Sequence, residues 1–188
     1  MLTRRLNAVP GVVLVAIAAA LWGLDPILRK PLASSTTATT IVFGEHVVLV
    51  LFTLPFLLPA LRAVWEAGPR NIAASIFVGG GASAVATILF TDALFHSDFI
   101  TPVVLQKVQP LVAVIGAAIV LRERPRSRFV WFLVPALLGL WLVNQPHPFQ
   151  PTANGLRPVI ESLAAAVLWA SGTVLGRYLG RELEFQHI

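Results

Sequence analysis

Cysteine is absent from this chain of 188 residues, and charged residues are scarce. The lack of cysteine excludes disulfides, thiolate nucleophiles and cysteine-ligated metals. Charged residues make up 12% of the chain, against roughly 25% in soluble domains. Hydrophobic residues reach 56%, and the mean hydropathy is +0.79. This composition indicates an integral membrane protein rather than a soluble domain.

Sequence motifs that carry enzymatic chemistry are missing as well. The chain contains no HExxH, no GxSxG, no phosphate-binding loop and no cysteine–histidine cluster. We therefore expect no catalytic residues, no metal site and no cofactor. The net charge of +5 raises the question of nucleic acid, but the cations flank apolar runs instead of forming a basic stripe with interleaved aromatics. The lipid bilayer is the expected partner, and nucleic acid is not.

Long apolar runs predict an all-α, polytopic membrane fold with about six transmembrane helices, because about 20 apolar residues cross a bilayer. The start of the chain resembles a secretory signal, with Arg4 and Arg5 before an apolar run, but we favour an uncleaved first span. The expected spans cover residues 10–28, 39–60, 72–95, 99–121 and 129–143, and a sixth begins near residue 158 after the polar linker 146–157.

The first and sixth spans are similar to each other. When Gly11 to Lys30 is laid over Pro158 to Arg177, six of twenty positions are identical, and Trp22 pairs with Trp169. Five spans separate the two copies, and an odd number reverses the direction of crossing, so the pattern predicts an inverted repeat. Residues 1–145 would form the first five-helix repeat, and residues 158–188 the first helix of an incomplete second one.

The distribution of cations predicts the orientation. With the N-terminus in the cytoplasm, ten of the fourteen lysines and arginines lie inside and three outside, and Lys107 lies within the membrane. Positive residues are concentrated in cytoplasmic loops. We therefore expect a multi-pass protein of the cell (plasma or inner) membrane with a cytoplasmic N-terminus.

Polar residues inside the spans are the candidate site. Lys107 lies within the fourth span, where an ammonium costs at least about 2.5 kcal/mol unless it meets a partner or water. Asp25 and Glu45 fall at a similar depth on other helices, so one of them is the expected partner of Lys107. Substrate binding and a purely structural ion pair both remain open for this group.

Four further residues complete the candidate substrate site and its coupling. Gln106 and Gln109 lie three residues apart on one helix side and could bind a polar substrate or hydrogen-bond between helices. Trp22 joins them as a substrate-binding candidate. Glu45 and His46 are weaker candidates for proton or ion coupling, and a hydrogen bond is the preferred role of His46.

Two helix irregularities are also expected. Pro26 should kink or end the first span and open its backbone to a possible ligand. The run Gly79 to Gly81 in the third span favours close helix packing, with a backbone-lined substrate path as the alternative.

Three segments resemble the drug/metabolite transporter superfamily, specifically its EamA-type permeases. They are ALWG at Ala20 to Gly23, the stretch Thr91 to Pro125 across the third and fourth spans, and SLAAAVLWASGTVLGRYLG at Ser162 to Gly180. The resemblance implies ten spans in two five-span repeats of opposite topology around a central cavity, and transport of small metabolites or drugs, often outward.

This chain supplies one such repeat and a single helix of the next. We therefore expect a secondary transporter, with export as one option, in a truncated or half-size form that acts on a small-molecule substrate. It could complete itself as a homodimer or with a complementary half-transporter. The alternative is a non-transporting membrane interaction subunit or an inactive fragment.

Overall fold

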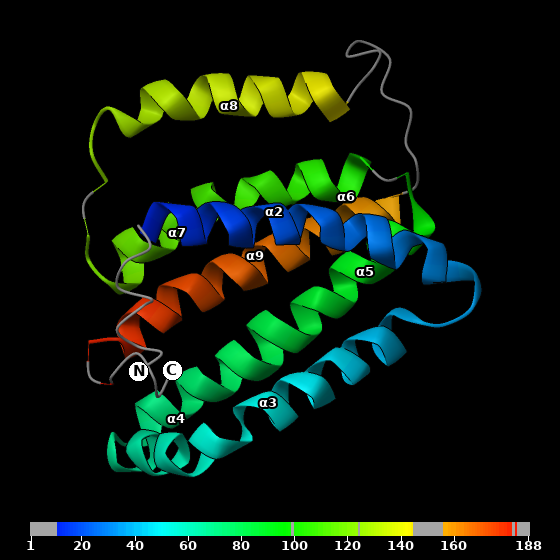
Figure 1. Ribbon diagram of the computed structural model, residues 1–188. Coiled ribbons are helices and arrows are strands. Elements are labelled where there is room, and N and C mark those ends of the chain that lie inside the picture. Colours follow the sequence, from blue (N-terminus) through cyan, green and yellow to red (C-terminus); the bar gives the residue numbers. More distant parts are fainter. Residues whose placement is uncertain (1–10, 99, 124, 145–155, 182, 184–188) are drawn as a thin grey trace.

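The computed structural model describes residues 11–98, 100–123, 125–144, 156–181 and 183, and within them it contains helices and no strand, so the all-α prediction is confirmed. Figure 1 shows the helices in one bundle. In chain order the elements are α2 (Gly11–Arg29), the 3₁₀ helix η1 (Lys30–Ser34), α3 (Ala38–Glu66), α4 (Pro69–Ile76), the π-helix η2 (Phe77–Val85), α5 (Ala86–His96), α6 (Ile100–Leu105), the 3₁₀ helix η3 (Gln106–Val108), α7 (Gln109–Val120), α8 (Phe129–Asn144) and α9 (Leu156–Leu179).

Five helical segments of the described chain are long and apolar enough to cross a membrane, namely Gly11–Ser34, Ala38–Glu66, Pro69–His96, Ile100–Val120 and Leu156–Leu179. The protein is thus a multi-pass membrane protein. Helix α8 has 16 residues, about 24 Å at 1.5 Å per residue, so a sixth crossing there stays a prediction. The possible signal segment at Arg4 and Arg5 and most of the linker 146–157 lie outside the described residues.

Prolines end neither of the first two spans. Helix α2 continues through Pro26 to Arg29, beyond the limit predicted at residue 28. Helix α3 contains Pro55 and Pro59 and runs to Glu66, six residues past the predicted end. Thr37 caps the start of α3, since its side chain accepts a hydrogen bond from the backbone N–H of Thr40 at 3.2 Å. Proline removes one backbone donor, but neighbouring turns keep a membrane helix intact.

Large apolar side chains cover the outside of α2 and α3. Examples that are more than 70% exposed are Val12, Leu28, Phe52 and Leu58. Water would disfavour such a surface, whereas lipid tails solvate it. The bundle is therefore built for a bilayer.

Helix α9 lies at the centre of the bundle, between α5 and α7 in Figure 1. A Cβ atom added to Gly172 would lie only 2.4 Å from the Cβ of Ala82 in η2, and one added to Gly116 of α7 would lie 3.2 Å from Val174 of α9. Small residues let membrane helices approach closely. The contact involves Ala82, which follows the run Gly79 to Gly81, whereas a Cβ added to Gly79 or Gly80 would meet nothing within 4 Å. Close packing of the glycines themselves stays a prediction.

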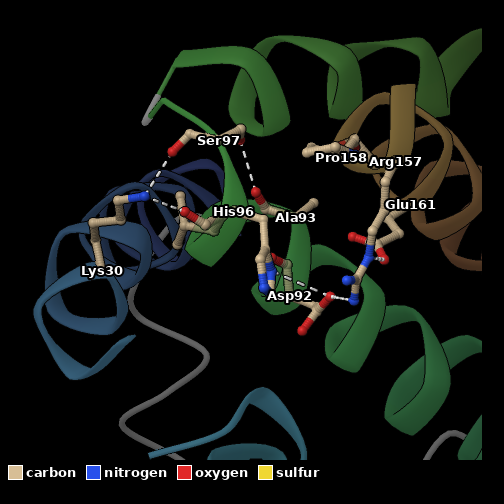
Figure 2. Close-up of polar contacts among 10 residues, drawn as sticks. Lys30, Asp92, Ala93, His96, Ser97, Arg157, Pro158 and Glu161 are labelled. Atoms are coloured by element: carbon tan, nitrogen blue, oxygen red, sulfur yellow. Dashed lines mark hydrogen bonds and ion pairs between the residues drawn. The ribbon is translucent and has the colours of Figure 1, made fainter. Parts of the chain in front are cut away.

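Ion pairs join both ends of α9 to other helices. At one end Arg157 pairs with Asp92 of α5 at 2.5 Å and with Glu161 of its own helix at 2.8 Å (Figure 2). At the other end Arg177 and Arg181 lie 3.0 and 3.2 Å from Glu123, which follows α7. These contacts tie α9 to the helices that precede it in the chain.

Candidate functional site

Arg29 is the centre of an ion cluster built from three helices. Its Nε lies 2.6 Å from Oδ2 of Asp25, and its NH2 lies 2.7 Å from Oε1 of Glu45 on α3. Its NH1 donates a hydrogen bond to Oγ1 of Thr91 on α5 at 3.0 Å. The Arg29 side chain is only 9% exposed, whereas the side chains of Asp25 and Glu45 are each 38% exposed. The cluster therefore holds its cation inside and presents two carboxylates at an accessible face.

Local sequence explains this geometry. Asp25 and Arg29 are four residues apart on α2, and residues at that spacing are neighbours on a helix. The short η1 segment then returns the chain into α3, where Glu45 lies about two turns from the start. With all three groups ionised, one guanidinium and two carboxylates carry a formal charge of −1. Ionisable groups within a membrane span are candidates for a substrate or ion path.

The expected pairing of Lys107 with Asp25 or Glu45 was wrong. Lys107 lies in the 3₁₀ helix η3, its side chain is exposed, and it makes no hydrogen bond or ion pair with the residues that the structure describes. Arg29, which the sequence analysis counted among the cations outside the membrane, pairs with both carboxylates instead. The spacing of Asp25 and Arg29 was the signal that could have revealed it.

The two glutamines of this segment differ in their surroundings. Gln106 is buried at the first position of η3, and Gln109 is half-buried at the start of α7. The backbone N–H of Gln109 donates to the carbonyl of Gln106, which closes a tight turn just before Pro110. Because η3 is a 3₁₀ helix, the Lys107 side chain leaves the helix axis in a different direction from the one it would take in a continuous α-helix.

His46 makes the hydrogen bonds expected of it. Its Nδ1 lies 2.8 Å from the carbonyl oxygen of Val42, and its Nε2 lies 3.1 Å from Oγ of Ser83 in η2. Because a carbonyl can only accept, Nδ1 carries a proton, and in the neutral ring Nε2 accepts from the Ser83 hydroxyl. The histidine thus links α3 to η2, beside Glu45 in sequence.

An aromatic group lies on α2, α5 and α9, and the first two of these helices also carry part of the ion cluster. Trp22 of α2 and Trp169 of α9 meet edge to face, with ring centroids 5.7 Å apart and planes at 73°. Trp169 also contacts Phe90 of α5 at 5.3 Å. Trp22 itself remains 54% exposed. It lies three residues before Asp25, so the indole and the carboxylate share a helix face.

Lys30 holds the neighbouring chain turn in place, as Figure 2 shows. Its ammonium donates to the backbone carbonyls of Leu94 and Ser97, the latter at 2.6 Å, where α5 ends. A cation at a helix C-terminus satisfies carbonyls that lack helical partners. This contact fixes η1 against α5 and so supports the position of Arg29 next to it.

Within the described part of the chain, no group of three or more histidine, aspartate or glutamate side chains is arranged to hold a metal ion.

Comparison with known proteins gives two matches. A model of the EamA-like transporter family matches residues 9–145. The riboflavin transporter ImpX of Fusobacterium nucleatum subsp. nucleatum is 29% identical over 187 residues, which are 96% of this chain and 62% of that protein. The chain thus spans less than two thirds of the length of this curated relative. No solved structure matches.

Proposed function

The chain belongs to the EamA-like transporter family, and from this premise we propose that it forms a secondary carrier, or one repeat unit of a carrier, for a small organic solute. No part of this role requires catalytic chemistry, so we propose that it is not an enzyme. The observation that carries the proposal is the polar and aromatic face of α2, where the half-exposed Trp22 lies next to an ion cluster with two accessible carboxylates.

We propose a planar, polar aromatic heterocycle such as riboflavin as the substrate class. The relative that covers 96% of this chain is named a riboflavin transporter. A flat ring system would stack on the exposed face of Trp22, and hydroxyl or amide groups would bond to Asp25 and Glu45. Gln106, Gln109 and Lys107 are proposed as further polar contacts of the substrate path, and Glu45 with His46 as the groups that would couple a proton or ion.

The proposed architecture is the start of an inverted repeat. Trp22 and Trp169 are equivalent positions of the two similar spans, and their rings are in contact. Equivalent residues meet when a two-fold axis passes close to them, so this contact supports the repeat. Helices that complete the cavity would come from a second copy or from a complementary half-transporter. We also propose a cytoplasmic N-terminus and residence in the cell membrane, on the charge distribution described above.

Equilibrium binding to the purified chain in detergent tests the substrate class. Riboflavin fluorescence should fall on binding and saturate, and unlabelled amino acids, small organic anions and cationic drugs should fail to displace it. Saturable displacement by one of these other classes would assign the site to that class and reject the heterocycle. Counterflow of riboflavin in proteoliposomes then tests transport, and binding without counterflow would favour the alternative of a non-transporting subunit.

A further inference from the structure

A groove lies at the end of the bundle opposite Arg29, between α7, α8 and α9. Its volume is about 580 Å³. Its walls are apolar and include Ala117 of α7 and Phe132 of α8, and Phe132 is 73% exposed. Figure 1 shows α8 set apart from α9 along one side of the bundle, and α8 packs mainly against α6. The groove is therefore open towards the surroundings of the bundle.

The mouth of this groove is positively charged. It is lined by Arg126, Arg128 and Arg177 and by one acid, Glu123. Glu123 is already bound by Arg177 and by Arg181 outside the groove. Arg126 and Arg128 are exposed and form no ion pair with any residue that the structure describes. Two guanidiniums are thus left to attract an anion.

The combination of an apolar wall and a cationic mouth defines the chemistry of the ligand. The groove is formed by the ends of α7 and α9, which are membrane-crossing segments, so its mouth lies at the boundary between hydrocarbon and water. A small soluble anion would bind the arginines but would leave the apolar wall without a contact. A neutral hydrocarbon would cover the wall but would leave the arginines without a counter-charge. Basic pockets at the ends of membrane helices suit anionic headgroups.

We propose that this groove binds an anionic phospholipid, with its phosphate on Arg126 and Arg128 and an acyl chain along the wall at Ala117 and Phe132. The guanidinium fork matches phosphate oxygens in a bidentate geometry. The lipid fills the gap between α8 and α9 and so holds α8 to the bundle. This proposal does not depend on the identity of the transported substrate.

Native mass spectrometry of the purified full chain tests the proposal, with phosphatidylglycerol and phosphatidylcholine of identical acyl chains as probes. Phosphatidylglycerol should bind more tightly than phosphatidylcholine. Arg128→Gln should lower the affinity for phosphatidylglycerol about fivefold, because one cation near an anionic headgroup contributes about 1 kcal/mol. The double variant Arg126→Gln with Arg128→Gln should lower it roughly 30-fold. Arg70→Gln is the matched control, because Arg70 is an exposed cation of α4 that does not line the groove.

A variant that changes only the shape of the groove distinguishes the contribution of the apolar wall to lipid binding from that of the arginines. Ala117→Phe narrows the groove without a change of charge, so it should also lower the affinity for phosphatidylglycerol. The circular dichroism spectrum of the lipid-free variant should remain that of a helical protein. If this variant loses its helicity, Ala113→Leu takes its place, because Ala113 lines the same wall one turn away.

Four outcomes would overturn the proposal. Equal affinity for the two lipids, or an equal effect of Arg128→Gln and Arg70→Gln, would remove the arginines from a lipid site. Competition by glycerol 3-phosphate at the same concentrations would assign the groove to a free anion. A dimer fraction that changes with the arginine variants, while phosphatidylglycerol binding does not, would assign it to a second copy of the chain.

Discussion

The guanidinium of Arg29 at the end of α2 lies 2.7 Å from the carboxylate of Glu45 in α3, and it also bonds Asp25 and Thr91. One nearly buried cation thereby joins α2, α3 and α5. The pair places an accessible carboxylate beside the aromatic face of α2, where the substrate site is proposed.

Arg29→Gln should lower the free energy of unfolding by about 3 kcal/mol, because it leaves the carboxylates of Asp25 and Glu45 without a cation. The loss lies at the low end of the range for buried ion pairs because these two side chains are partly exposed. Lys107→Gln should change it by less than about 0.5 kcal/mol, since Lys107 is exposed and forms no ion pair within the described residues. Denaturant titration in detergent, followed by circular dichroism, measures both.

The double variant Arg29→Gln with Glu45→Gln should recover part of the loss, because one unpaired carboxylate is removed with its cation. An equal loss of stability for Lys107→Gln and Arg29→Gln would contradict the assignment of Arg29 as the structural cation of this cluster.

Gly172→Ala should destabilise the protein by about 1 to 3 kcal/mol, because the new Cβ would lie 2.4 Å from that of Ala82 and α9 would have to move. Gly176→Ala on the same helix is the control, since nothing lies within 4 Å of its added Cβ, and it should be neutral or slightly stabilising. Thermal unfolding compares the two. Ala82→Gly should restore the thermal stability of the Gly172→Ala protein. If stability is not restored, the contact between α9 and η2 is not the cause of the destabilisation.

Trp22→Ala should weaken riboflavin binding by about 10-fold or more, because the loss of an aromatic contact removes about 1 to 3 kcal/mol of stacking. Trp22→Phe should retain most of the affinity. Trp65→Ala serves as the control, since Trp65 lies near the far end of α3 and is 76% exposed. Fluorescence titration gives the dissociation constants. Similar losses for Trp22→Ala and Trp65→Ala would exclude Trp22 from the site.

The orientation can be read from single cysteines, because the native chain contains none. Ser127→Cys, between α7 and α8, should be protected from a membrane-impermeant maleimide in intact cells, and Ser35→Cys, between η1 and α3, should be labelled. Both serines are exposed in the structure. Both sites should react after the membrane is permeabilised. The reverse pattern in intact cells would place the N-terminus outside.

The sequence by itself determined the class of the protein and most of its helices. Apolar runs such as the one from Ile41 to Leu58 have no stable place in water, and a bilayer requires that each crossing satisfy its backbone as a helix, so composition and length alone predicted the spans. The family resemblance was carried by local segments as well, and the match over residues 9–145 confirms it. The inverted repeat and the orientation stay predictions.

Only the tertiary structure decided which charges meet. Depth along the spans placed Lys107, Asp25 and Glu45 in one layer, but depth says nothing about the direction in which a side chain points around its helix. The continuation of α2 through Pro26 brought Arg29 to the carboxylates, and the tight turn of η3 left Lys107 exposed. Rotation about a helix axis is set by packing against neighbours, and those neighbours are distant in the chain.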